Sequence, residues 1–275
     1  MIAPKYELTT TTRTTETGET VYQIRAIEDI PTHGVRRGDL GGFIGANVTL
    51  RYDAWVFGNA QAYGTARLVG AAKLSGSAQI CDSASMSGNA KASGHARISG
   101  AATIQGFARV TGSATISGRA RIMNAAIVSD SAHVGQKAII FDFAHITGTA
   151  CVTGSARVGG FATITDKAHV SGRVIIKCNA QVAGHAHVGE EVMLSDNVII
   201  RDHARIYGKA RILDNAQIVD AAQVYDSAEV SGNACVTSAT TIFGKARIDG
   251  NTKLAGEASF YDTTHMGSNL QAATN

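Results

Sequence analysis

From Ile44 to His265 the chain can be written as thirty-seven six-residue lines with no residue left over. The lines that begin at Val56 read VFGNAQ, AYGTAR, LVGAAK and LSGSAQ, and the pattern continues to FYDTTH, which begins at Phe260. The first position is Leu, Ile or Val in thirty-three lines, and the third is Gly in twenty and Asp in ten. A period of six fits neither an α-helix nor a long strand. It indicates a solenoid whose repeats bury their apolar faces against one another.

The residue types at each hexad position predict where that position lies in the fold. Positions five, six, one and two read small, polar, aliphatic, polar, as in Ala96-Arg97-Ile98-Ser99, which is typical of a short strand with one face inward. Gly, Asp and Asn at position three suit a bend with a left-handed backbone conformation. We therefore expect positions one and five to be buried, and positions two, four and six to face outward.

The repeats, together with the preceding segments VYQIRAIEDI and RGDLGGFI, resemble a bacterial and prophage-type subgroup of hexapeptide-repeat proteins described as transferases. The resemblance implies an all-β fold, a single-stranded left-handed parallel β-helix (solenoid) of about twelve three-sided coils, in which residues eighteen apart stack. It also implies an acyl-CoA-dependent O- or N-acyltransferase that works as a trimer. Acetyl-CoA or another acyl-CoA is then the co-substrate, and the active site lies between subunits.

The residues before the repeats differ from them in pattern. Tyr6 to Thr12 and Thr20 to Ala26 are rich in β-formers and flank Glu16-Thr17-Gly18-Glu19, which predicts a β-hairpin that caps the first coil. Thr32 to Phe43 is a glycine-punctuated connector. We therefore expect a hairpin cap and connector over 1–43, a hexapeptide-repeat β-helix over 44–265, and a polar tail over 266–275.

Charge and cysteine usage limit the partners and the compartment. The net charge of +3 is small and the basic residues are spread along the repeats, so no nucleic-acid partner is expected. No run of eighteen apolar residues and no secretory signal pattern is present, so we expect no membrane span. The four cysteines fall in different columns of the eighteen-residue register, which predicts no intrachain disulfide and suits a cytoplasmic protein.

Four histidines are the candidate catalytic residues. On the eighteen-residue register His169 and His187 stack on adjacent coils, and His185 and His203 stack one corner away. A neutral imidazole is a suitable general base near pH 7, and in the resembling acetyltransferases an outward histidine deprotonates the acyl acceptor. The alternative is that all four are polar surface residues on a Gly/Ala scaffold. Four histidines in two columns do not form a recognised metal-ligand spacing, so no metal is expected.

Several outward columns suggest contacts rather than chemistry. One set is apolar and predicts the interface of a homo-oligomer, a trimer by resemblance: Met123, Ile139, Phe141, Ile175, Met193 and Leu213. A second set is an aromatic column for which self-stacking is the favoured explanation and partner contact the alternative: Tyr207, Tyr225, Phe243 and Tyr261. Corner carboxylates also stack, as Asp202 does with Asp220 and Asp196 with Asp214, and bend geometry explains them.

The repeats contain no inserted loop, and this feature weighs against an enzyme. Binding sites are concave, whereas an uninterrupted solenoid has flat walls, so any pocket must come from subunits packed side by side. Two further hypotheses therefore stand beside acyl transfer. One is a non-catalytic scaffold or interaction protein. The other is a polymer formed by stacking of the open C-terminal end.

Overall fold

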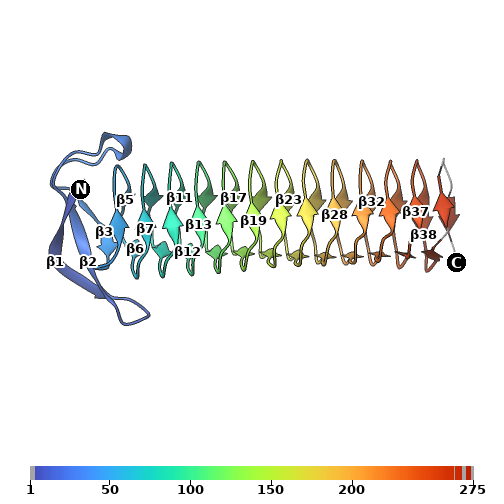
Figure 1. Cartoon of the computed structure of the whole chain (residues 1–275), viewed down its shortest axis with the longest axis horizontal. Helices are drawn as coiled ribbons and strands as arrows, with labels where there is room; N and C mark the ends of the chain where they lie inside the picture. The colour runs from blue at the N-terminus through green and yellow to red at the C-terminus, as the bar shows by residue number, and fades with distance from the viewer. Residues whose placement is uncertain (1–3, 263, 268–270, 274–275) are drawn as a thin grey trace. The chain divides into compact units, whose positions relative to one another are not determined.

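A computed structural model describes residues 4–262, 264–267 and 271–273. The chain is an all-β parallel solenoid of about twelve coils, which confirms the predicted fold class. It consists of two compact units, residues 1–136 and residues 137–275. In both units each coil contributes one short strand to each of three sheets, and Figure 1 shows strands of successive coils stacked side by side.

Residues 1–136 begin with two long antiparallel strands and a short 3-10 helix, and then enter the coils. The first sheet of this unit contains β1 (Tyr6–Thr14), β2 (Thr20–Ala26), β3 (Leu40–Ile44), β6 (Gln61–Ala62), β9 (Gln79–Ile80), β12 (Arg97–Ile98), β15 (Thr115–Ile116) and β18 (His133–Val134). The second contains β4 (Thr49–Leu50), β7 (Arg67–Leu68), β10 (Ser85–Met86), β13 (Thr103–Ile104) and β16 (Arg121–Ile122). The third contains β5 (Trp55–Val56), β8 (Lys73–Leu74), β11 (Lys91–Ala92), β14 (Arg109–Val110) and β17 (Ile127–Val128); the 3-10 helix η1 is Pro31–His33.

Residues 137–275 repeat the same coil. One sheet contains β21 (Cys151–Val152), β24 (His169–Val170), β27 (His187–Val188), β30 (Arg205–Ile206), β33 (Gln223–Val224), β36 (Thr241–Phe243) and β39 (Ser259–Tyr261). A second contains β19 (Ile139–Ile140), β22 (Arg157–Val158), β25 (Ile175–Ile176), β28 (Met193–Leu194), β31 (Arg211–Ile212), β34 (Glu229–Val230), β37 (Arg247–Ile248) and β40 (His265–Met266). The third contains β20 (His145–Ile146), β23 (Thr163–Ile164), β26 (Gln181–Val182), β29 (Ile199–Ile200), β32 (Gln217–Ile218), β35 (Cys235–Val236), β38 (Lys253–Ala255) and β41 (Gln271–Ala273).

The eighteen-residue register is confirmed in both units. Ser85 pairs with Thr103 in residues 1–136, and His169 pairs with His187 in residues 137–275. Side chains at positions one and five, such as Ile206 and Ala204, are fully buried and form the core along the axis of the coils. Trp55 departs from the expectation for position six because it is only 1% exposed. Burial fades at the last coil, where Phe260 is half-exposed.

The corners explain the choice of Gly and Asp at position three. Every residue at this position from Tyr52 to Asp262 has a positive φ, between 49° at Asp262 and 92° at Gly256. An acidic side chain there has a second role, because it accepts a hydrogen bond from the backbone N–H eighteen residues on. Asp166 accepts from Gly184 at 2.9 Å and Asp220 accepts from Ser238 at 3.0 Å. The corner carboxylates are therefore structural hydrogen-bond acceptors.

Position four carries a side-chain ladder in residues 137–275 that the sequence analysis missed. The amide nitrogen of each asparagine donates to the amide oxygen of the next one, with distances of 2.8 to 2.9 Å, through Asn179, Asn197, Asn215, Asn233 and Asn251. Asparagine ladders satisfy the exposed amides within the stack and tie successive coils together. The signal was present in the sequence, because asparagine occupies position four of every third hexad over five coils.

The N-terminal strands contact the first coils. β1 pairs antiparallel with β2, β2 pairs antiparallel with β3, and β3 continues parallel into β6. Val21 is buried in a cluster with Phe43, Tyr63 and Cys81. The hairpin is thus attached to the first edge of the coils, and its capping role remains a prediction. The predicted tail contains β41, which pairs with β38 of the repeats. Residues 268–270, 274 and 275 of this tail lie outside the described residues.

Candidate functional site

Two histidines stand on adjacent strands of the first sheet of residues 137–275. His169 on β24 pairs in register with His187 on β27, between Cys151 on one side and Arg205 on the other. The imidazole centroids are 5.6 Å apart and the ring planes are tilted by 46°. Position six faces outward, so His169 is half-buried and His187 is exposed. The stacking predicted from the register is therefore present.

The second histidine pair lies at the turns that enter β27 and β30. His185 and His203 occupy position four of their hexads, and both side chains are exposed. Their rings are stacked with centroids 4.9 Å apart and planes 21° from parallel. The two pairs overlap in one coil, because His185 and His187 both belong to it, whereas His169 lies one coil before and His203 one coil after. The sequence thus predicted how these four side chains pair, whereas their catalytic role remains a prediction.

The electrostatics of the cluster favour neutral imidazole at His187. Partial burial, the neighbouring ring of His169 and the Arg205 guanidinium lower the pKa of His187 below its usual value of 6.5. A nearby positive charge disfavours a second one, so the cluster adds to the effect of burial and favours the neutral form of this ring. Among the described residues, none of the four rings has a carboxylate within ion-pair distance. The rings are positioned by stacking on the sheet, without an acidic partner.

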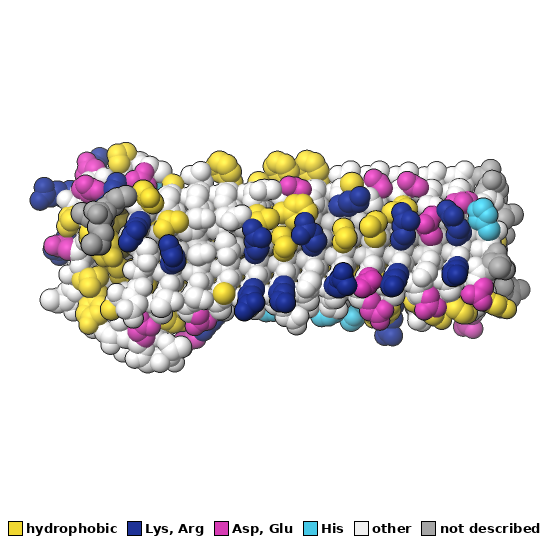
Figure 2. All heavy atoms as spheres, in the orientation of Figure 1, with side chains coloured by type: hydrophobic (Ala, Val, Ile, Leu, Met, Phe, Trp, Pro, Cys, Tyr) yellow, Lys and Arg dark blue, Asp and Glu magenta, His cyan; other side chains and the backbone are white. Residues whose placement is uncertain are grey.

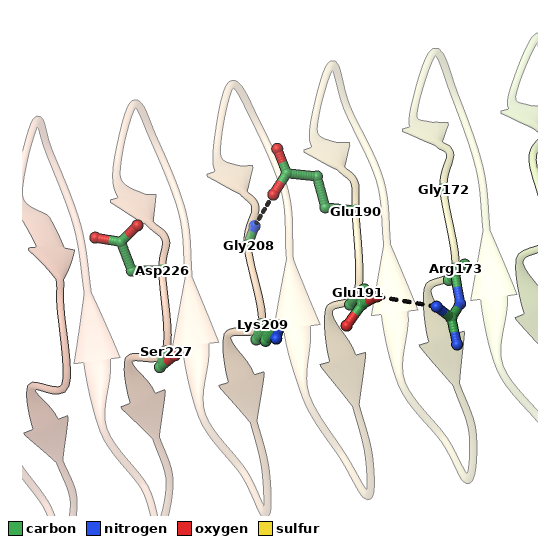
Figure 3. A pocket seen from close by; sticks show the side chains of 8 residues that line it. All are labelled: Gly172, Arg173, Glu190, Glu191, Gly208, Lys209, Asp226 and Ser227. Carbon is green, nitrogen blue, oxygen red and sulfur yellow. Dashed lines mark hydrogen bonds and ion pairs between the residues drawn. The ribbon is translucent and has the colours of Figure 1, made fainter.

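A groove of about 630 Å³ lies at the turns that follow β24, β27, β30 and β33, and the sequence analysis did not anticipate it. Its lining comes from positions three and four of four successive coils: Gly172, Arg173, Glu190, Glu191, Gly208, Lys209, Asp226 and Ser227. Figure 3 shows these side chains along the turns. Arg173 pairs with Glu191 at 3.1 Å, and the Glu190 carboxylate accepts the Gly208 N–H at 2.8 Å. Lys209 has no ion-pair partner among the described residues.

The predicted interface residues face outward, as expected from their hexad positions. Ile139, Ile175 and Met193 lie on β19, β25 and β28. Arg157 stands between Ile139 and Ile175, Ile175 pairs directly with Met193, and Arg211 follows Met193. Figure 2 shows hydrophobic and basic side chains interleaved on the face in view. Arg157 therefore separates Ile139 from the adjacent Ile175 and Met193, so the apolar patch is interrupted at one strand.

The remaining members of that interface set differ in how accessible they are. The Phe141 ring lies over Gly159, where an added Cβ would come within 2.3 Å of it, and the Arg157 guanidinium lies 5.6 Å from the ring centroid. Leu213 is half-buried, and so is Met123, which belongs to residues 1–136. Phe141 is therefore partly satisfied within its own chain. Participation of the set in an oligomer remains a prediction.

Two aromatic ladders run along residues 137–275. Tyr225, Phe243 and Tyr261 stack with centroid distances of 5.2 and 5.4 Å, which confirms the self-stacking interpretation for three of the four predicted rings. Tyr207 instead lies against Gly189, where an added Cβ would be 3.0 Å from the ring. A second ladder was missed. Phe143 and Phe161, at position four, stack at 5.1 Å although they are 54% and 62% exposed.

Other chemistry finds little support in the described part of the chain. No group of three or more His, Cys, Asp or Glu side chains there is placed to hold a metal ion. The four cysteines, all of which the structure describes, are free thiols, and burial raises the pKa of Cys81, Cys151 and Cys235. Within the described residues no helix is long and apolar enough to cross a membrane.

Comparison with known proteins does not assign the chain. No protein-family model matches the sequence. No curated protein matches it either. What the chain can do must therefore be argued from its own side chains.

Proposed function

We propose that the chain is an acyl-CoA-dependent O- or N-acyltransferase whose active site forms between subunits around His187. The observation that supports this proposal is an exposed imidazole with a lowered pKa, fixed on a strand beside a second histidine and an arginine. A general base near neutral pH needs a free nitrogen lone pair and access to the acceptor, and His187 meets both requirements.

In this proposal His187 acts by proton transfer. Its neutral ring takes the proton of the acceptor's O–H or N–H group while that oxygen or nitrogen forms its bond to the acyl carbon. The bond between the acyl carbon and the CoA sulfur breaks, and the imidazolium returns the proton to the leaving sulfur. Arg205 on β30 and Lys209 at the turn that follows it supply positive charge for an anionic co-substrate, whereas Arg173 is already paired with Glu191.

The second wall of the site is assigned to a neighbouring subunit. The histidine strands form a flat sheet face, and a ligand site needs concavity. The apolar side chains on β19, β25 and β28 belong to a different sheet of the same coils, so an oligomer joined there brings another copy close to the histidine sheet. A homotrimer satisfies this requirement by closed symmetry.

The test is turnover of acetyl-CoA against a panel of amines and sugars. Replacing His187 or His169 with Ala is expected to reduce acetyl transfer by about a hundred- to ten-thousand-fold and to leave the melting temperature unchanged. Because the pKa of His187 is lowered and the deprotonated ring is the active form, the rate should be retained below pH 6.5 and fall only at more acidic pH. His145→Ala, on β20 in another sheet, is the matched control and should turn over like the wild type.

A non-catalytic scaffold is the second candidate, and one observation favours it. The asparagine ladder runs through five coils without a break, as expected of a chain selected for a regular surface. The two candidates differ in ligand binding. Acetyl-CoA at a hundred times its dissociation constant stabilises a binding protein by about 2.7 kcal/mol. A wild type that shows neither this stabilisation nor turnover supports the scaffold. Polymers through the C-terminal end, seen in light scattering, would instead support the separate hypothesis of a polymer.

Assembly can be tested separately from catalysis. Ile139→Asp combined with Ile175→Asp is expected to convert the trimer to monomer in light scattering, because both carboxylates would be buried without partners. Ile175 is 37% exposed in the single chain, so the substitutions should leave the fold of the monomer intact. Ile199→Asp on β29 places the same charge on another sheet and should leave the trimer unchanged. A wild type that is already monomeric at micromolar concentration would contradict the interface and the shared site together.

A further inference from the structure

A second groove, of about 310 Å³, lies within residues 1–136. Its floor is the third sheet of that unit and the adjoining corner, and its wall is the 3-10 helix of the connector. The floor residues come from three successive coils, as Ala71 with Lys73, Asn89 with Lys91, and Phe107 with Arg109, and the wall residues are Thr32 and His33. The groove is therefore concave within a single chain, unlike the flat histidine face.

Three cations line the floor in a row. Lys73 on β8 pairs with Lys91 on β11, which pairs with Arg109 on β14, so their side chains leave the sheet about 4.8 Å apart. None of the three has an ion-pair partner among the described residues. Like charges at this spacing repel one another, and an anion placed among them removes that cost. The row therefore favours a ligand with several negative charges.

The single carboxylate in the flanking columns is already occupied. Asp53 lies at the corner two residues before Trp55, and it accepts bonds from Lys5 at 3.0 Å and from the Thr32 hydroxyl. These two partners lower the pKa of Asp53 and hold it ionised. On the other side the flanking column reads Ser75, Ser93 and Thr111, which carry no charge. The flanking columns thus offer these cations no free counter-charge.

The wall is fixed before any ligand binds. Thr32 is tied to Asp53, and the backbones of Ile30 and Val35 form an antiparallel bridge below it. The His33 ring meets the Phe57 ring edge-on at 5.9 Å, and the Lys73 ammonium lies 4.6 Å from the Phe57 centroid. The Nε2 atom of His33 is buried without a hydrogen-bond partner. A wall that is held in place by its own contacts and carries an unsatisfied ring nitrogen is typical of a preformed binding site.

Two side chains at the rim of this groove are suited to contact an aromatic ring of a ligand. Phe107 is 66% exposed and belongs to the same coil as Arg109, two residues before it. An exposed aromatic face is a stacking platform for a nucleobase. Asn89, one coil before it, is exposed, and its side-chain amide has no partner among the described residues. Such an amide both donates and accepts hydrogen bonds, as a base edge requires.

We propose that this groove binds a nucleoside di- or triphosphate. The phosphates lie along Arg109, Lys91 and Lys73 toward the Thr32–His33 wall, and the base stacks on Phe107 beside Asn89. The site is independent of the acyltransferase proposal, because its residues belong to residues 1–136 and the histidine cluster belongs to residues 137–275. Inorganic pyrophosphate shares the anionic part of this chemistry but lacks the base.

The test is isothermal titration calorimetry of the full chain with ADP, pyrophosphate and adenosine. ADP is expected to bind with one site per chain, pyrophosphate more weakly, and adenosine not measurably, with the affinity for ADP falling as NaCl is raised. Phe107→Ala should weaken ADP binding by about five-fold to a hundred-fold and leave pyrophosphate binding unchanged, since only the base stacks. Equal affinity of the wild type for ADP and pyrophosphate would overturn the base contact and reduce the groove to a phosphate site.

Charge reversal separates the groove from general electrostatics. Lys91→Glu should weaken the binding of both ADP and pyrophosphate by about ten-fold or more, because it removes the middle cation and adds a repulsive charge. Arg67→Glu on β7, in another sheet of the same unit, changes the net charge equally and should leave both affinities unchanged. Both side chains are exposed, so the melting temperatures should stay at the wild-type value. Equal losses in the two variants, or no heat with ADP in the wild type, would overturn the proposal.

Discussion

Gly154→Val is expected to lower the free energy of unfolding by about 3 kcal/mol or more. Gly154 sits at a corner with φ of +71°, where a β-branched side chain is strained, and an added Cβ would lie 2.5 Å from both N and O of Gly172. Both are backbone atoms of the next coil, and the Gly172 carbonyl oxygen also accepts a hydrogen bond from the Ser155 N–H at 2.7 Å. The next coil cannot move away from the added side chain without breaking this hydrogen bond. The measurement is the urea midpoint by circular dichroism.

Two comparison variants make the result specific to the corner. Ser155→Val changes the adjacent exposed residue, whose φ is not positive, and is expected to stay within about 0.5 kcal/mol of the wild type. Gly154→Asp should cost less than Gly154→Val, because its carboxylate can accept the Gly172 N–H as Asp142 accepts that of Gly160 at 3.1 Å. A valine variant with the wild-type midpoint, or one equal to the aspartate variant, would show that corner geometry does not control stability.

The periodic part of the structure could be predicted because each contact repeats between neighbouring coils. Ala at position five and Ile or Val at position one have the same neighbours in every coil, so one hexad predicts the burial of all the others. For the same reason the stacking of His169 on His187 followed from counting eighteen residues. The corner carboxylates were predicted from bend geometry, although their hydrogen bonds to the next coil were not.

The aperiodic features could not be predicted in this way. The position of Thr32 and His33 over Lys73 depends on the bonds of Asp53 to Lys5 and Thr32, which join segments far apart in sequence. Tyr207 lies against Gly189, the preceding residue of its own column, where the absent side chain leaves room for the ring, and the sequence analysis did not anticipate this contact. The asparagine ladder, by contrast, was readable from spacing alone. Tertiary contacts that occur once need the structure, and contacts that repeat do not.

Ile206→Asp is expected to be the most damaging substitution in residues 137–275, with a loss of about 4 kcal/mol or more. Ile206 on β30 is fully buried, between Val188 on β27 and Val224 on β33. A carboxylate there has no cation and no donor along the core. Burial raises the pKa of such a carboxyl, so the loss should shrink as the pH is lowered and the group becomes neutral. Arg205→Asp, one residue earlier and exposed, should cost about 0.5 kcal/mol or less.

The same charge at the last coil should cost far less, because a solenoid is stabilised by contacts between neighbouring coils. Phe260 on β39 is half-exposed, and its strand has a hydrogen-bonded neighbour, β36, on one side in its sheet. Phe260→Asp therefore disrupts one coil interface, whereas Ile206→Asp disrupts two, and the end coil can fray without unfolding the rest. The free energy of unfolding of the central coils, obtained from their urea transition, is expected to fall by about 1.5 kcal/mol or less. If both variants unfold at the same urea concentration, residues 137–275 melt as one cooperative block, and nearest-neighbour stacking is not the unit of their stability.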